Sequence, residues 1–214
     1  METDRIKIKT FIIVIASIVF IEIAAIIPAS EIHTNPMIIL GIVRLLEITM
    51  IILVVMIWGK GLSCIGLGTS TITRGIKKGL LWSAFFGLAT GIVFLVLYFS
   101  GINPLTFFHT QLPDKNADIF LFLTVGCIVG PVAEELFFRG ILYGFFRKWG
   151  ILPALIFTTI IFVFSHRNIS VLPVTQIVGG VIFALAYEIE ENLMVPIIIH
   201  ILGNTAIFIL PYIL

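Results

Sequence analysis

Apolar stretches alternate with short polar segments along the whole chain. Seven of the apolar stretches are long enough, or nearly so, to cross the core of a bilayer, which takes about 20 residues of helix. They lie at about residues 11–28, 37–59, 79–100, 118–147, 151–167, 174–189 and 193–213. Because they take up most of the 214 residues, no separate soluble domain fits between them. The pattern predicts an all-α fold, a polytopic transmembrane helix bundle of about seven spans that forms one membrane domain over residues 1–214.

The composition agrees with this membrane class. Hydrophobic residues make up 59% of the chain and charged residues 12%, whereas soluble chains carry about 25% charged residues. With 13 Lys and Arg against 12 Asp and Glu, the net charge is +1, which argues against a nucleic-acid partner. The two cysteines, Cys64 and Cys127, are too few for a disulfide framework. The partner that the composition predicts is the lipid bilayer.

Lys and Arg fall mainly on one side of these spans, and such segments usually face the cytoplasm. A cytoplasmic N-terminus leaves two of them outside, Lys115 and Arg167. It places nine inside: Arg5, Lys7, Lys9, Lys60, Arg74, Lys77, Lys78, Arg147 and Lys148. The inside segment 188–192 is an exception, because it holds three glutamates and no base. We expect an integral, multi-pass protein, of the cell membrane in a prokaryote, with a cytoplasmic N-terminus and an outer C-terminus.

The first half of the chain, residues 1–117, is expected to supply accessory helices and a basic cytoplasmic loop. The loop at about 60–78 is rich in glycine and carries Arg74, Lys77 and Lys78. Its pattern is typical of a loop followed by a short surface helix that touches anionic headgroups. An ordinary basic loop that fixes the topology is the alternative.

Ionisable side chains inside a bilayer are costly and usually pair with one another. Glu22 in the first span, with Arg44 and Glu47 in the second, forms one such group. Arg44 and Glu47 are three residues apart and therefore share a helix face. We interpret the group as an ion pair that locks the first two helices together, with a role in substrate entry as the alternative.

A second polar group is spread over three later spans. Its members are Glu134, Glu135, Arg139, His166, His200 and Asn204. Counted from the inner helix ends at about 1.5 Å per residue, Glu134 lies about 20 Å deep, His166 about 22 Å and Asn204 about 16 Å. Arg139 and His200 lie at about 12 Å and about 10 Å on the same count. Three helices thus place polar side chains in one layer of the membrane, which predicts a polar cavity.

The spacing within this group indicates which side chains face each other. Glu135 and Arg139 are four residues apart, in the order that favours an ion pair on one helix face. Glu134 points about 100° away from Glu135, so the two carboxylates need not share a role. His200 and Asn204 are also four apart and project together.

The span at 118–147 contains Gly130-Pro131 just before the two carboxylates. Pro131 has no N–H to donate to the carbonyl of Cys127, and its ring disturbs that turn. We therefore expect the helix to kink there and to widen the polar layer.

These residue types suit the hydrolysis of an amide. A carboxylate and an imidazole can hold a water molecule between them and remove its proton. A histidine and an asparagine on one helix face can donate to the oxyanion that forms on attack. Taken singly, the Glu135–Arg139 pair is also explained as a structural clasp and His200 as an interhelical hydrogen bond. The combination favours catalysis.

Three short motifs stand in order on the polar spans: Glu134-Glu135-Leu-Phe-Phe-Arg139, Phe162-Val-Phe-Ser-His166 and His200-Ile-Leu-Gly-Asn204. They match the E-E-x-x-x-R, F-x-x-x-H and H-x-x-x-N motifs of the CPBP intramembrane proteases, and the chain resembles that family. The family includes the type II CAAX prenyl endopeptidases and bacteriocin-processing or self-immunity proteins. The resemblance covers about residues 118–210, which it marks as a CAAX-protease-like catalytic core.

The resemblance implies four catalytic residues in two pairs. Glu134 and His166 would activate the hydrolytic water, and His200 and Asn204 would stabilise the oxyanion. Three further residues would orient and line the site: Glu135, Arg139 and Phe162.

The same resemblance raises the question of a metal. The family was long described as metalloproteases, and two histidines with a glutamate can hold zinc. The depth estimate separates His166 from His200 by about 10 Å, too far to share a metal unless helix tilt closes the gap. We therefore expect a metal-free glutamate mechanism without a cofactor, with zinc as the alternative. The family's eukaryotic members have about eight spans, and the kinked fourth span or a re-entrant segment at 60–78 would account for one more.

The expected function is that of an intramembrane endopeptidase. Its substrate would be a membrane-associated or lipidated protein or peptide, prenylated CAAX-type substrates included. The alternative is a non-enzymatic bacteriocin-immunity or peptide-binding membrane protein that uses the same cavity. A proton-coupled transporter would also use buried carboxylates, although the chain shows no internal repeat of the kind common in transporters.

Overall fold

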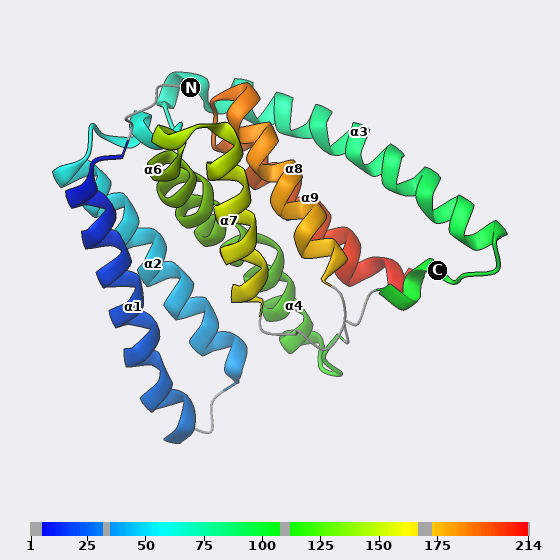
Figure 1. Ribbon diagram of the computed structural model, residues 1–214. Coiled ribbons are helices and arrows are strands. Elements are labelled where there is room, and N and C mark those ends of the chain that lie inside the picture. Colours follow the sequence, from blue (N-terminus) through cyan, green and yellow to red (C-terminus); the bar gives the residue numbers. More distant parts are fainter. Residues whose placement is uncertain (1–5, 32–34, 108–111, 167–172, 214) are drawn as a thin grey trace.

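The computed structural model describes residues 6–31, 35–107, 112–166 and 173–213, and within these ranges it contains helices and no strand (Figure 1). Six of the helical elements are α1 (Ile8–Glu31), α2 (Pro36–Trp58), α3 (Ile72–Phe99), α7 (Ile151–Ser165), α8 (Val174–Glu190) and α9 (Met194–Ile213). A seventh, composite helix runs from Asn116 to Trp149 between α3 and α7. The predicted all-α bundle of about seven helices is confirmed.

Length and apolar composition support membrane insertion of most of these helices. Five described helical stretches are long and apolar enough to cross a bilayer: Ile8–Ile26, Pro36–Trp58, Thr69–Phe99, Asn116–Trp149 and Met194–Ile213. The helix Ile151–Ser165 is apolar but shorter, and α8 has 17 residues. The protein is therefore an integral, multi-pass membrane protein, as expected.

The composite helix changes its winding around the two carboxylates. It consists of α4 (Asn116–Thr124), a π-helical segment Val125–Val129, α5 (Gly130–Glu135), a second π-helical segment Leu136–Tyr143, α6 (Gly144–Phe146) and a 3₁₀ turn Arg147–Trp149. The irregularity expected at Pro131 takes the form of π-helix on both sides of α5. The Gly130 N–H bonds to the Val125 carbonyl, five residues back, so the helix is already wound more widely where Pro131 enters. Such π segments are frequent at functional sites.

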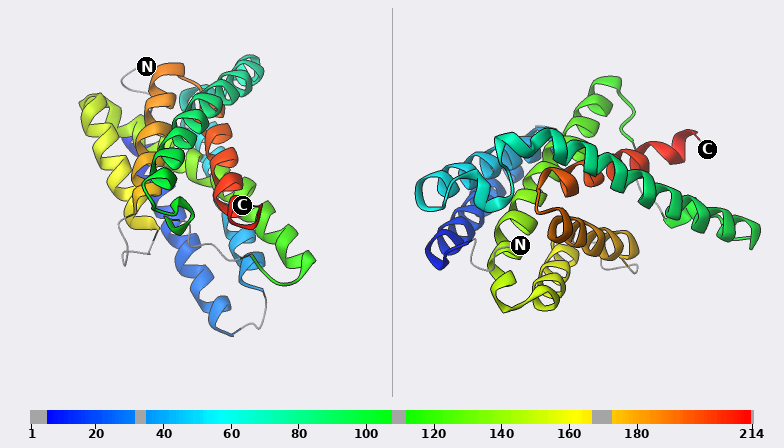
Figure 2. Two further views of the ribbon diagram at one scale, coloured as in Figure 1. Left: turned by 90° about the vertical axis from the view of Figure 1, so that its right-hand side faces the viewer. Right: turned by 90° about the horizontal axis from the view of Figure 1, so that it is seen from above.

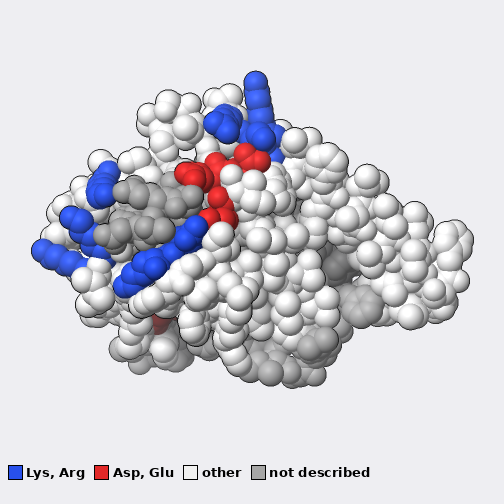
Figure 3. Space-filling view, turned by 45° about the horizontal axis from the view of Figure 1, so that its top comes forward, with Lys and Arg blue, Asp and Glu red and all other residues white. Residues whose placement is uncertain are grey.

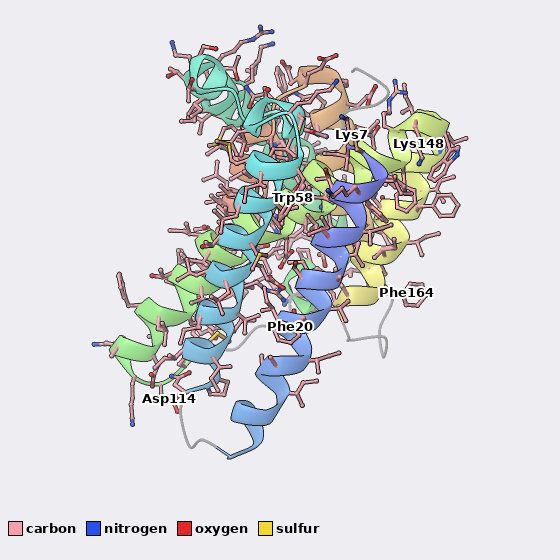
Figure 4. All side chains as sticks on the ribbon, turned by 90° about the vertical axis from the view of Figure 1, so that its left-hand side faces the viewer. Lys7, Phe20, Trp58, Asp114, Lys148 and Phe164 are labelled. Atoms are coloured by element: carbon pink, nitrogen blue, oxygen red, sulfur yellow. The ribbon has the colours of Figure 1, made fainter. Side chains whose placement is uncertain are left out.

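One end of the bundle gathers the basic segments that the sequence placed inside. Figure 4 shows Lys7, Trp58 and Lys148 at this end and Asp114 at the opposite one. We call it the basic end. The acidic segment that seemed exceptional also lies here: Glu188 pairs with Arg147 at 2.9 Å. Both signs therefore occur side by side on this face, as Figure 3 shows.

The opposite end is tied together by contacts of its own. Asn35 donates a hydrogen bond of 2.8 Å to Asp118, and the Leu112 N–H bonds to the Tyr212 hydroxyl. Within the described residues, α1 therefore begins at the basic end and α9 finishes at the other, as an odd number of crossings requires. Which end faces the cytoplasm stays a prediction. Arg5 and Arg167, two of the residues used to orient the chain, lie outside the described residues.

The segment 60–71 forms two 3₁₀ turns, Leu62–Ile65 and Thr69–Thr71, and no extra span. It packs into the bundle: Cys64 and Ile65 are buried, and the Leu193 N–H bonds to the Gly66 carbonyl at 3.1 Å. The basic residues expected on a separate surface helix lie instead in the first turns of α3, because that helix already begins at Ile72. The expectations of a separate surface helix and of a re-entrant segment were therefore wrong, whereas contact of these basic residues with headgroups stays a prediction.

α3 lies across α9 and then leaves the bundle (Figures 1 and 2). The close approach of α3 to α9 depends on two glycines of α3, Gly75 and Gly79. A Cβ on either would come within 2.7 Å of a side-chain atom of α9 or of the turn before it. Beyond this contact the helix exposes large apolar side chains such as Phe85, Leu88 and Phe99. Exposed apolar side chains of this kind suit a lipid environment.

The ion pair expected between the first two helices is present. Arg44 Nη1 lies 3.1 Å from Glu22 Oε1 of α1 and 2.5 Å from Glu47 Oε2 of its own helix. One guanidinium therefore joins α1 to α2 within the apolar region, as a structural lock requires.

Candidate active site

Three helices bring a carboxylate and two imidazoles together in the interior of the bundle. Glu134 comes from α5, His166 from the C-terminal end of α7, and His200 from the second turn of α9. Glu134 Oε2 lies 3.7 Å from His166 Nε2 and 3.8 Å from His200 Nε2. Three of the polar side chains that the sequence placed in one layer of the membrane therefore lie next to one another.

The other ring nitrogen of each histidine is already bound. His200 Nδ1 lies 2.7 Å from Glu135 Oε1, and His166 Nδ1 lies 2.8 Å from the Phe162 carbonyl oxygen. A carboxylate and a carbonyl accept hydrogen bonds, so each Nδ1 carries a hydrogen, and Nε2 is an acceptor whenever its ring carries no second hydrogen.

Three acceptors thus face one another: two Nε2 atoms and Glu134 Oε2. The Glu134 oxygen is buried and has no hydrogen-bond partner among the described residues. Its distances to the two rings exceed hydrogen-bond length. A small molecule that donates two hydrogens, as water does, satisfies such an arrangement.

Behind this group lies a buried ion pair. Arg139 Nε is 3.2 Å from Glu135 Oε2, and Arg139 Nη1 donates to Glu135 Oε1 at 3.2 Å. Its Nη2 donates to the Gly180 carbonyl of α8 at 3.2 Å. Both side chains are essentially inaccessible, at 0% and 1% exposure. Since Glu135 also binds His200, the pair fixes the ring that faces Glu134.

Two phenylalanine rings pack against Arg139 and the two histidines. The Arg139 guanidinium lies 4.7 Å from the ring centre of Phe162 and 5.2 Å from that of Phe183. Phe183 also stacks on His200, with ring centres 4.7 Å apart and planes 25° apart. Phe162 lies against His166, with ring centres 4.5 Å apart.

Phe183 and the Gly180 carbonyl were not predicted from the sequence. Small residues such as Gly179-Gly180 let membrane helices approach closely. Here a Cβ on Gly180 would lie 3.0 Å from Thr159 of α7. Nothing in the sequence distinguishes Phe183 from the other phenylalanines of the spans.

Asn204 differs from its expected arrangement. Its Nδ2 donates to the Gly126 carbonyl at 2.9 Å, in the first π-helical segment, rather than to the Glu134 group. The amide retains a second hydrogen. His200 donates through Nε2 only when its ring carries both hydrogens. The oxyanion role of these two residues stays a prediction.

The donor set has the right chemistry for zinc, because both histidines hold Nδ1 against an acceptor, as metal-bound histidines do. Its spacing is less suitable. Ligand atoms about 2.0–2.1 Å from a tetrahedral zinc lie about 3.3 Å apart, closer than the atoms of Glu134 and the histidines. Within the described ranges no group of three His, Cys, Asp or Glu side chains is arranged to hold a metal ion.

The depth argument that separated the two histidines by about 10 Å was wrong. His166 Nε2 and His200 Nε2 both lie within 4 Å of one oxygen atom. Depth was counted along each helix axis, whereas tilted helices and side-chain length bring the ring tips together. Helix tilt therefore closes the gap.

Known proteins resemble the part of the chain that holds this site. Residues 116–206 match the family model described as type II CAAX prenyl endopeptidase Rce1-like. The membrane-embedded CAAX protease MroQ of Staphylococcus aureus (strain USA300) is 38% identical over an alignment of 97 residues, which covers 42% of this chain and 38% of MroQ. YdiL of Bacillus subtilis (strain 168), named as a membrane peptidase, is 32% identical over 91 residues, 42% of this chain and 37% of its own.

The matched stretches span well under half of these relatives and of this chain. No solved structure matches at the same level of significance. All three motifs fall inside the matched region, which also contains Phe183. Over residues 116–206 the chain therefore resembles the type II CAAX prenyl endopeptidase (Rce1-like) family, as its three motifs predicted.

Proposed function

We propose that this protein is an intramembrane endopeptidase that hydrolyses a peptide bond of a membrane-associated protein or peptide. The observation that carries the proposal is the convergence of Glu134 Oε2 with the Nε2 atoms of His166 and His200. Similarity to proteins named as membrane peptidases supports the same reaction class.

In the proposed mechanism, Glu134 and His166 bind one water molecule and Glu134 takes its proton as the water oxygen attacks the scissile carbonyl carbon. The carbonyl oxygen becomes an oxyanion, which His200 in its doubly protonated form and the second amide hydrogen of Asn204 would stabilise. The proton held by Glu134 then passes to the leaving amine as the C–N bond breaks. The products are a new carboxylate and a new amine.

The remaining site residues would hold the reacting groups in place. Glu135 accepts from His200, so it fixes the ring with Nε2 toward Glu134. Arg139 holds that carboxylate, and Phe162 supplies both a ring wall and the carbonyl that orients His166. Such supporting contacts keep catalytic groups within the small tolerances that rate enhancement needs.

The proposed substrate class is a peptide or protein anchored in or at the bilayer, with lipidated chains included. One relative is named as a CAAX protease, and the matched family model is described by prenylated CAAX substrates. Access from the membrane suits a site formed between transmembrane helices.

The proposal is tested with purified protein in liposomes. Lipidated and unlipidated forms of one peptide are offered, and fragments are identified by mass spectrometry. In cells, membrane-peptide fragments are compared between the parent and a Glu134→Gln strain. The same two strains are exposed to a bacteriocin. If the protein acts only by binding the peptide, the Glu134→Gln strain should stay protected. If protection depends on proteolysis, this strain should lose it.

We propose that the reaction needs no metal, with zinc as the alternative. Exhaustive chelation followed by removal of the chelator should leave the cleavage rate within about twofold of the untreated protein. The measurement is the initial rate, with metal content determined on the same sample. A rate that falls and returns only with zinc would overturn the metal-free mechanism.

Phe183→Leu should slow cleavage by about threefold to tenfold, the equivalent of about 0.5–1.5 kcal/mol for a lost aromatic contact. Leucine keeps an apolar side chain but cannot stack on His200. The change should appear in kcat rather than KM. Phe164→Leu is the control, because Phe164 is exposed on α7 (Figure 4). Equal rates for the two variants would contradict a positioning role.

A further inference from the structure

A hollow of about 430 Å³ lies at the basic end, on the first turns of α3. It is lined by Thr73, Arg74, Lys77, Lys78 and Leu81. These positions follow the spacing of one helix face. The opposite face of the same turns, with Gly75 and Gly79, packs against the start of α9.

The charge of the hollow favours an anion. Of its three cations, Lys78 pairs with Glu190 at 3.3 Å. The same carboxylate oxygen accepts a hydrogen bond from Trp82 Nε1. Arg74 and Lys77 are exposed, and among the described residues they have no ion-pair partner. Two of the three cations are therefore available to pair with a further negative group.

The hollow lies where a lipid headgroup would be expected, at the boundary between the basic and the apolar parts of α3. Its basic residues lie in the first turns of α3, and the apolar, exposed Leu80 and Leu81 follow directly. Trp82, with its ring nitrogen bonded, is of the type enriched at membrane interfaces. The hollow therefore offers cations to a phosphate and an apolar surface to the first part of an acyl chain.

We propose that this hollow binds the headgroup of an anionic phospholipid. The Arg74 guanidinium suits two phosphate oxygens at once, and the Lys77 ammonium adds a point charge. Lys side chains also offer their aliphatic stems to the lipid glycerol region.

Binding at this place would strengthen the contact between α3 and α9. α3 is held to the bundle through its inner half, around Gly75 and Gly79, while its outer half is exposed. A lipid bound to the first turns adds a second attachment there. Anionic lipid should therefore raise the unfolding temperature of the protein. Because α9 carries His200, the same contact should also help to hold His200 in its place.

The test compares two lipids on one protein. Purified full-length chain in detergent is given equal amounts of phosphatidylglycerol or phosphatidylcholine, and bound lipid is measured by native mass spectrometry. Arg74→Gln/Lys77→Gln should lower bound phosphatidylglycerol at least about fivefold, since each base near a headgroup contributes about 1 kcal/mol. Phosphatidylcholine binding should not change.

The matched control is Lys7→Gln/Lys148→Gln. It removes the same charge from the same end, from exposed residues outside the hollow. The control should retain phosphatidylglycerol, and its unfolding temperature should still rise with that lipid. The proposal is overturned if the Arg74/Lys77 variant binds phosphatidylglycerol like the parent. It is also overturned if the control loses as much, because that shows only a general charge effect. Neither outcome depends on proteolytic activity.

Discussion

Glu134→Gln is expected to lower the rate of peptide cleavage by at least about a thousandfold, within the range lost when a general base is removed. Glutamine has nearly the same shape and keeps one oxygen toward the two histidines. Its amide cannot take a proton from water, so the attacking hydroxide does not form. The measurement is the initial rate of peptide cleavage in liposomes, with fragments identified by mass spectrometry.

Folding should survive this change, because the substituted carboxylate has no salt-bridge partner other than the two imidazoles among the described residues. The control is Glu22→Gln, which removes a different membrane carboxylate from the ion pair with Arg44. It should cleave at close to the parent rate. A Glu134→Gln protein that cleaves as fast as the parent would remove Glu134 as the base and with it the proposed mechanism.

Arg139→Met should cause the largest loss of stability among the site variants, about 3–5 kcal/mol, the usual effect of removing one partner of a buried pair. Glu135 would be left charged at 0% exposure without its guanidinium. Cleavage should also fall, because Glu135 would no longer hold His200 in place. Unfolding in detergent and cleavage rate are measured on the same preparation.

The double variant Glu135→Gln/Arg139→Met separates stability from catalysis. Replacing both partners of a buried pair is often neutral for stability, so unfolding should return toward the parent. Cleavage should stay low, since His200 Nδ1 has lost its carboxylate acceptor. Arg147→Met is the control, because it breaks a different ion pair, with Glu188, which is partly exposed and lies at the basic end. This variant should cleave at close to the parent rate. If the double variant recovers full activity, the pair has no positioning role.

The sequence determined the class of protein and the outline of its site. Apolar runs of spanning length predicted the helices, because a bilayer leaves a spanning segment few alternatives to a helix. Costly ionisable residues inside those runs marked the site, and Glu134, His166 and His200 do meet there. The ion pairs of Arg44 and Arg139 followed from spacing along a helix, which is a local property.

Contacts between helices could not be predicted in this way, because they depend on tilt, on crossing angle and on side-chain rotamers. The separation of His166 from His200 was overestimated for this reason. The partner of Asn204 depends on where the π-helical turn places the Gly126 carbonyl. The stacking of Phe183 on His200 depends on how α8 crosses α9. Sequence spacing thus determined which groups share a helix face, and only tertiary packing decided which faces meet.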